Sequence, residues 1–450
     1  MNELATLAGF CSATTFATLP AGTRRQVAVV LADSVGAMVA GAREAEVRAL
    51  VTRRGQGGAA TIVGSDARTS EENAALLNGI AGTAVEMDEG NHASGGHPAM
   101  HVIPAALATA EIAGATGAEL VTAIACGYEV AARVGAATRL GAALHPHGTW
   151  GVVGAAAAVA RLRRLALPAT IGALQIAATL ALATSRTSAT SGATVRNAYA
   201  GVANRNGMLA CDLAQSGFTG EANALAIAFG QVLGSGFDAT QLTRNLGGQW
   251  QIGANFIKLA ASCRETHGAL DSLESLLASL VGGSIDADSI ATIRVETFES
   301  AAGLGERQPT SPLAARFSIP FTLATRIVNR SAAVESFAAE ALSDARVRNL
   351  ANKVEVSERP DLTARIPYER IAEVRIELVD GRFLYSRASG NRGDFDQPVN
   401  EAAHAAKFLA LVAPTWGGRS ASVREACLDI ANIDDVRAFV RRLGKSHIVT

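Results

Sequence analysis

Apolar residues recur at helical spacing through nearly all of residues 22–240, and this pattern limits the fold more than any other feature of the chain. Segments such as GTRRQVAVVLADSVGAMVAGA and GAELVTAIACGYEVAARVGAATRL carry few charges and many alanines and glycines, so their backbones can pack closely. SEENAALLNGIAGTAVEM opens with Ser70 as a helix cap, followed by two acids that suit a helix start. No convincing strand pattern interrupts the series, which therefore predicts a large all-helical unit.

The pattern changes after about residue 260. SIATIRVETF and KVEVSE alternate as strands do, and RIAEVRIELVDGRFLYSRAS reads as a hairpin with an Asp-Gly turn. Helical patterns lie between these strands, and the chain becomes helical again near its end. We therefore predict a mainly α protein: an all-helical domain made of residues 1–258 and 398–450, and a smaller α+β domain, residues 259–397.

The charges favour neither nucleic acid nor membrane as a partner. There are 40 basic and 41 acidic residues, and a net charge of −1 supplies no basic surface. The start, MNELATLAGFCSATTFATLP, does not have the pattern of a signal peptide, and we expect the uncharged run 165–185 to be a buried core helix rather than a membrane span. Five scattered cysteines without a CxxC pair are typical of free thiols, so we expect a cytoplasmic protein.

The stretch VEMDEGNHASGGHPAMHVIPAALA, residues 85–108, concentrates acids, histidines, glycines and prolines between apolar helices. Two further breaks in the helical pattern also carry histidine, AALHPHGTWGVVGAAAA and FIKLAASCRETHGALDS. Loops held by rigid helices are where binding and catalytic groups concentrate, although a histidine before proline also caps or ends helices. We expect His97, His145, Lys258 and His267, from these three loops, to line one cleft.

The motifs favour no cofactor. GTWGVVGAAAA resembles a dinucleotide loop only superficially, because no strand precedes it, and the sequence has neither a P-loop nor a GxSxG elbow. His92, His97 and His101 could ligate a metal together with Asp88. However, we expect Pro98 to interrupt the helix that would place His97 and His101 on one face. We therefore predict neither a metal nor an organic cofactor.

Lysine is rare in this chain, and its positions are informative for that reason. Only Lys258, Lys353, Lys407 and Lys445 occur among 40 basic residues. A lysine kept against such a bias can be one whose compact, titratable ammonium arginine cannot replace, although chance explains any single lysine equally well. Lys258 also lies nine residues before His267, in the third of the histidine loops.

These loops resemble those of the MmgE/PrpD family, and the resemblance extends over about residues 20–415. The shared pieces occur in the order VEMDEGNHASGGHPAMHVIPAALATAE, CGYEVAARVG, LHPHGTWGVVGAAAA, GFTGE, KLAASCRETHGALDS, SPLAARFSIPF and GDFDQPVNEAAHAAKF. The resemblance implies an N-terminal helical domain, an α+β lid domain and a homodimer. It also implies an active site in the cleft between the domains that works without metal or organic cofactor.

The resemblance further implies a set of site residues. The positions that match catalytic family residues are His97, His145, Lys258 and His267. The positions assigned to substrate binding are Arg196, Glu86, Asp88 and His92. We expect Glu86 and Asp88 to orient and charge-balance either the histidines or the Arg196/Lys258 pair rather than to contact an anionic substrate directly. Arg196 stands where many members have lysine, and Phe321 stands where many have tyrosine.

The chemistry implied by the resemblance is proton transfer at a carbon next to a carboxylate of a small di- or tricarboxylic acid. A cofactor-independent hydro-lyase of the 2-methylcitrate dehydratase type is the first expectation. An epimerase that moves a proton between the two faces of a dicarboxylate such as iminodisuccinate, and a cis-aconitate-type decarboxylase, are the alternatives. A non-enzymatic helical scaffold is a fourth hypothesis, and it predicts histidine loops that lie far apart.

Overall fold

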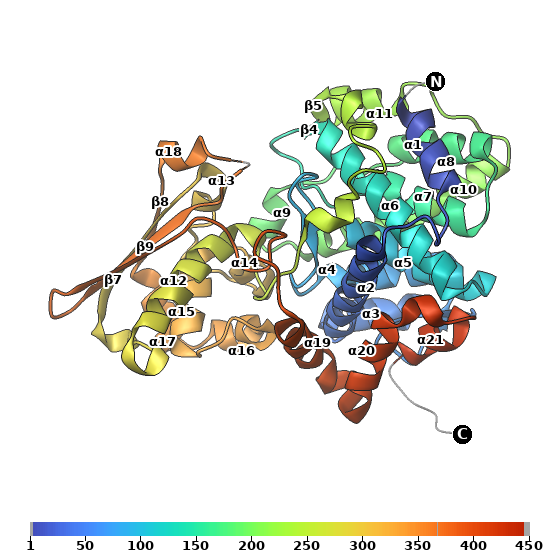
Figure 1. Cartoon of the computed structure of the whole chain (residues 1–450). Coiled ribbons are helices and arrows are strands. Elements are labelled where there is room, and N and C mark those ends of the chain that lie inside the picture. The colour runs from blue at the N-terminus through green and yellow to red at the C-terminus, as the bar shows by residue number, and fades with distance from the viewer. Residues whose placement is uncertain (1–2, 367, 445–450) are drawn as a thin grey trace.

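A computed structural model describes residues 3–366 and 368–444. The chain is mainly helical, as the sequence predicts, and its strands of five or more residues lie in the second half (Figure 1). The helices of the first part are α1 (Glu3–Ala13), α2 (Ala21–Gly41), α3 (Ala45–Arg54), α4 (Glu71–Thr83), α5 (Pro98–Ala113), α6 (Gly117–Ala137), α7 (Gly151–Leu162), α8 (Leu167–Thr179), α9 (Thr187–Thr190), α10 (Ala198–Gln215) and α11 (Ala224–Ile227).

The core of the first part forms where α4, α5, α6, α7 and α10 pack against one another. Small residues allow this close approach: the Cα of Gly201 on α10 lies against Gly79 on α4, where a side chain on either residue would strike backbone. α6 is long and apolar enough to cross a membrane by composition, but 94% of its apolar window is buried inside the protein. The predicted core helix within residues 165–185 corresponds to the shorter α8.

Three pairs of short strands occur in this first part, where the sequence showed no strand pattern. They are β1 (Ala60–Thr61) with β2 (Arg68–Thr69), β3 (Gly90–Asn91) with β6 (Asn255–Phe256), and β4 (Thr138–Leu140) with β5 (Gly234–Phe237). Each strand is two to four residues long, too short for the alternation that identifies strands in a sequence. The β3–β6 pair matters most, because it joins the acidic loop to the segment that carries Lys258.

The second part is an α+β unit built on a four-stranded sheet of order β10-β9-β7-β8. The strands are β7 (Ile290–Thr297), β8 (Val354–Glu358), β9 (Ala372–Leu378) and β10 (Phe383–Ala388). The helices are α12 (His267–Ser279), α13 (Glu299–Ala302), α14 (Pro312–Arg316), α15 (Ile319–Val328), α16 (Ala339–Leu342), α17 (Ala345–Asn352) and α18 (Pro360–Thr363). β7 pairs with β8 in parallel, and β9 pairs antiparallel with both β7 and β10.

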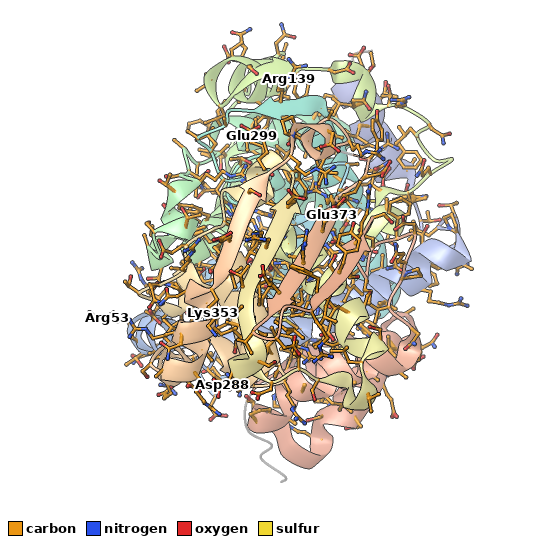
Figure 2. All side chains as sticks on the ribbon, turned by 90° about the vertical axis from the view of Figure 1, so that its left-hand side faces the viewer. Arg53, Arg139, Asp288, Glu299, Lys353 and Glu373 are labelled. Atoms are coloured by element: carbon orange, nitrogen blue, oxygen red, sulfur yellow. The ribbon has the colours of Figure 1, made fainter. Side chains whose placement is uncertain are left out.

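One face of the sheet is covered and the other is open. α12 packs against β9 and β10, and apolar residues such as Ile293 and Val374 are buried on that side. Figure 2 looks onto the open face, where Glu373 pairs with Arg359 and Arg387. The predicted β9–β10 hairpin is present, with Gly381 of its Asp-Gly turn at a φ of +84°.

The chain then returns to the first part through α19 (Glu401–Trp416), α20 (Ser420–Leu428) and α21 (Val436–Arg442). α19 and α20 pack on α2, and α21 packs on α5 (Figure 1, red helices). These contacts support our proposal that residues 1–258 and 398–450 form one domain and that residues 259–397 form the lid domain.

The close α4–α10 contact predicts different effects for two helical glycine-to-alanine changes. Gly201→Ala should lower the free energy of unfolding by about 1–3 kcal/mol, because the new methyl group meets the Leu76 carbonyl oxygen and the Ile80 side chain. Gly172→Ala on α8 is the matched control, since its methyl group would meet nothing nearer than 3.9 Å and should be neutral or stabilising. Urea or thermal unfolding of both variants measures the difference, and equal midpoints would contradict this packing.

Candidate active site

The acidic loop begins where α4 ends. After Thr83 the chain turns through Glu86, which has a φ of +55° although it is not glycine, and then forms β3. Gly90 is required there, because a side chain on it would collide with the Phe256 ring on the paired strand β6. The loop ends at His97, the residue that precedes α5.

Pro98 leaves His97 outside the helix that carries His101, because it starts that helix rather than breaking a longer one. Pro98 is the first residue of α5, a position where its missing N–H costs no helical hydrogen bond. His101 lies one turn into that helix, and its Nδ1 donates to the His97 carbonyl oxygen at 2.8 Å. Pro98 therefore starts the helix and sets the direction in which the loop enters it.

Two acids and two cations form a buried charge cluster at the centre of the molecule. The Lys258 ammonium lies 3.1 Å from Glu86 Oε2 and 3.1 Å from Asp88 Oδ1, and the Arg196 guanidinium pairs with the other oxygen of Glu86. All four side chains are at most 1% exposed. The acids thus balance the cations, as expected from the sequence.

The pKa shifts follow from this pairing. Burial acts to raise the pKa of Asp88, but His97 and Lys258 outweigh it and hold that pKa well below its usual range. Burial acts to lower the pKa of Lys258, but Asp88 and Glu86 raise it above its ordinary value. Asp88 is therefore ionised and Lys258 charged at neutral pH.

His97 is oriented by this cluster. Its Nδ1 lies 3.0 Å from Asp88 Oδ2 and 2.6 Å from the Glu89 carbonyl oxygen. Because both neighbours are acceptors, Nδ1 carries a proton. The His97 side chain is 12% exposed, whereas Asp88 behind it is fully buried. The ring is thus held by a backbone carbonyl, with a carboxylate close to the same nitrogen.

Three more histidines surround His97, and their hydrogen bonds distinguish them. Both ring nitrogens of His101 are hydrogen-bonded, since Nδ1 donates to His97 and Nε2 accepts from the Gly148 N–H at 2.9 Å. His145 Nδ1 accepts from the His147 N–H at 3.1 Å, and its Nε2 lies 3.4 Å from Arg196 Nε. His147 is buried, and neither of its ring nitrogens has a hydrogen-bond partner in the described part of the chain.

These surrounding histidines are neutral at pH 7. Burial lowers the pKa of His101 to about 4. Burial, followed by the charge of Arg196, also holds the pKa of His145 and of His147 well below the ordinary value. The sequence contains both histidines in HPH, but only His145 matches a family motif, and His147 was not singled out.

His92 and His267 lie in a second cluster, on the lid side of the loop. His92 Nε2 is 2.7 Å from Asp394 Oδ1, and the same carboxylate pairs with Arg264. Arg264 in turn reaches His267 Nδ1 at 3.2 Å. Among the described residues, no hydrogen bond, ion pair or ring contact joins His267 to His97, His145 or Lys258. Burial, Arg264 and Lys258 together lower the pKa of His267. The ring of Phe256 separates the clusters, with its centroid 4.9 Å from that of His92 and 6.0 Å from that of His97.

Two further features lie beside the charge cluster. Within residues 3–366 and 368–444, Asp88, His97 and His147 are the group whose ligand atoms lie close enough to hold a metal, within 4.8 Å of one another. A cavity of about 620 Å³ opens between the first part and the lid, and its lining includes Ala84, Asn197 and Arg316. Val195 and Asn197, the chain neighbours of Arg196, also line this cavity.

Glu89, next to Asp88, predicts a pH effect on stability. Its carboxyl group accepts from the Tyr128 hydroxyl at 2.5 Å and the Ala99 N–H at 3.1 Å, and burial raises its pKa to about 8. The folded protein thus holds a proton that the unfolded chain releases above about pH 4. Stability contributed by Glu89 is therefore complete at low pH and is lost as the pH rises from about 4 to about 8.

Glu89→Gln keeps the side chain neutral and should remove this dependence. Between pH 5.5 and pH 8 the unfolding midpoint of the wild type should fall by about 2 °C or more beyond that of the variant. Thermal unfolding of both proteins across this range, in one buffer series, is the measurement. Parallel curves would show that Glu89 is ionised throughout.

Comparison with known proteins identifies the family of this chain. The model of the MmgE/PrpD N-terminal domain matches residues 5–241, and the model of the MmgE/PrpD C-terminal domain matches residues 260–430. A cis-aconitate decarboxylase of Aspergillus terreus is 25% identical over 414 residues, covering 86% of this chain and 84% of the relative. A cis-aconitate decarboxylase-like protein, oryM, of Aspergillus oryzae is 26% identical over 373 residues, 76% of each chain.

A mammalian relative is similar to the same extent. The cis-aconitate decarboxylase of Mus musculus is 26% identical over 368 residues, covering 77% of this chain and 72% of the relative. The two domain models together cover most of the chain and leave only its ends and the junction near Lys258 unmatched. The chain therefore belongs to the MmgE/PrpD family of enzymes.

Proposed function

We propose that the protein is a cofactor-independent lyase that transfers a proton at a carbon adjacent to a carboxylate of a small tricarboxylic acid. The observation that carries the proposal is His97, whose Nδ1 donates to the Glu89 carbonyl oxygen and lies 3.0 Å from Asp88, and whose Nε2 has no hydrogen-bond partner among the described residues. An imidazole held in this way transfers a proton through Nε2, accepting it as a base or delivering it as an acid. The names of the curated relatives, which are cis-aconitate decarboxylases, support a tricarboxylate as the substrate.

Lys258 supplies the electrostatic part of this mechanism. An ammonium group has three N–H donors, and Glu86 and Asp88 take two of them. The third is left for a substrate carboxylate, which must accept the negative charge that develops when the adjacent carbon loses a proton. A fixed cation at that position lowers the barrier without reorganising during the reaction. Arg196 pairs with the Glu86 oxygen that Lys258 does not contact.

The other predicted residues take supporting roles in this proposal. Glu86 and Asp88 hold the cations and do not meet the anionic substrate. His145 uses its Nδ1 lone pair on the His147 N–H, so it is a poorer base than His97. His92 and His267, joined through Asp394 and Arg264, form the lid side of the site.

Within the lyase class, the relatives favour decarboxylation over the dehydration that the sequence suggested first. In decarboxylation, His97 first takes H⁺ from solvent; the bond from carbon to one carboxylate then breaks, CO₂ leaves, and the electron pair left on carbon forms a C–H bond with the H⁺ that His97 delivers. In dehydration, a base removes H⁺ from one carbon, and the hydroxyl group on the neighbouring carbon is protonated and leaves as water. Both routes need one proton transfer at carbon, and His97 serves either. Epimerisation of a dicarboxylate stays the alternative from another reaction class.

We propose that the reaction needs no metal. The three possible ligands Asp88, His97 and His147 are close together, but the Lys258 ammonium already neutralises Asp88 at 3.1 Å. A divalent cation there would face this ammonium at short range, which is unfavourable in a buried site. Activity that is lost on chelation and restored by a divalent ion would contradict this part of the proposal. The homodimer and the cytoplasmic location stay predictions, and light scattering of the purified protein tests the first.

The proposed function predicts turnover of a tricarboxylate with a defined fate of its atoms. Wild-type protein incubated with cis-aconitate in D₂O should release CO₂ and give a five-carbon dicarboxylate with deuterium at one carbon, seen by proton NMR. The same assay with 2-methylcitrate, citrate and iminodisuccinate separates dehydration and epimerisation from decarboxylation. If none of these acids is consumed or exchanges a carbon-bound proton, the proposal is wrong.

His97→Gln should reduce kcat by about 100-fold or more, because the variant has no group that delivers or accepts the proton at carbon. Its unfolding midpoint should stay close to that of the wild type, since Gln fills much of the same volume. Activity within a few-fold of the wild type in this variant would remove His97 from the mechanism.

A further inference from the structure

Three buried cations donate to the backbone carbonyls of one short segment, Thr83–Met87. Arg196 reaches the Thr83 carbonyl oxygen at 3.0 Å, Arg316 the Ala84 carbonyl oxygen at 3.1 Å, and Lys407 the Met87 carbonyl oxygen at 3.0 Å. They come from a turn before α10, from α14 of the lid, and from α19 near the C-terminus. Three distant parts of the chain therefore converge on five residues.

Such contacts are unusual, because a buried cation normally requires a full countercharge. Lys407 has Asp33 at 2.5 Å, and Arg196 has Glu86. Arg316 is 2% exposed, yet Glu44 is no closer to it than 3.9 Å, and burial raises the pKa of this acid. The guanidinium thus depends on the Ala84 carbonyl, at the end of α4 where a helix dipole favours cations.

The segment that receives these contacts is the one that builds the catalytic cluster. Glu86 lies within it in the left-handed region, which residues other than glycine occupy only when their surroundings enforce it. In this conformation Glu86 and Asp88, two residues apart, both reach Lys258. Asp88 then holds His97.

We propose that Arg316 and Lys407 are positioning residues of the reaction. They bind the carbonyls on either side of Glu86 and hold this segment in the conformation that places Asp88 against His97. Neither needs to contact the substrate. The inference deepens the proposed function, and its activity readout rests on that function.

Arg316 also connects the lid domain to the reaction. The next residue, Phe317, lies under the Arg196 guanidinium, with the charge centre 5.4 Å from the ring centroid. One short element of the lid therefore supplies one of the three cations that bind the acidic segment, Arg316, and supports a second, Arg196. The position of the lid sets the geometry of a site whose base and acids all come from the helical domain.

Arg316→Met is the direct test, with Arg326→Met as the matched control. Arg326 makes an ion pair with Glu274 inside the lid, through bonds of 2.6 and 2.8 Å, and touches no part of the acidic segment. Arg316→Met should lose about 100-fold in kcat, the cost of a misplaced catalytic group, with KM changed only a few-fold. Arg316→Lys should recover part of the loss, and Arg326→Met should keep the wild-type kcat.

Hydrogen exchange gives a readout that does not depend on turnover. Backbone amides of residues 84–91 should exchange faster in Arg316→Met than in the wild type, and should be unchanged in Arg326→Met. Lys407→Met alone would leave the buried Asp33 carboxylate without its cation. The double variant Asp33→Asn/Lys407→Met therefore tests the contact of Lys407 with Met87 with both charges removed. It should show the same loss of kcat and the same faster exchange.

The outcomes separate this inference from the proposed function. If the wild type turns over its substrate and both clamp variants match it in kcat, the positioning role is wrong. If the wild type is inactive on every acid tested, the proposed function fails, and the exchange experiment alone decides the inference. Unchanged exchange at residues 84–91 in folded clamp variants overturns it, and so does an equal loss of kcat in Arg326→Met.

Discussion

The structure of the site depends on one buried ammonium group that is shared by two carboxylates. Lys258 lies 3.1 Å from both Glu86 and Asp88, and none of the three side chains is more than 1% exposed. Removing such charges from water is unfavourable unless each has partners at close range. The acidic loop, its left-handed turn at Glu86 and the pairing of β3 with β6 all serve to bring these groups together.

This constraint explains why so apolar a protein carries a polar loop through its middle. The helices of the first part supply a rigid, dry surrounding in which a carboxylate stays ionised and neighbouring histidines stay neutral. A neutral imidazole beside an ionised acid is what proton transfer near pH 7 requires. The lid completes the enclosure, with Arg264 and Asp394 on one side of Phe256 and Arg316 on the outer side of the acidic segment.

Much of this could be predicted from sequence, and the failures have physical reasons. The helices and the four-stranded sheet were predictable because their periodicities extend over many residues. The pairing of Glu86 and Asp88 with Lys258 and Arg196 was predictable because isolated charges in an apolar chain must compensate one another. Arg316 was not, because its partner is a backbone carbonyl 232 residues away, which leaves no pattern in the sequence. Whether Pro98 would break a helix or start one was not predictable either, because proline does both.

The account makes one central claim: the cluster around Lys258 and His97 is where a tricarboxylate reacts. A crystal structure of the His97→Gln variant with cis-aconitate tests this most directly, because the substrate is bound but not consumed. We predict one substrate carboxylate on the Lys258 ammonium and its adjacent carbon about 3–3.5 Å from the side chain of residue 97. A ligand that is well ordered elsewhere, for example only in the cavity beside Arg316, with the Lys258 cluster closed, would contradict the claim.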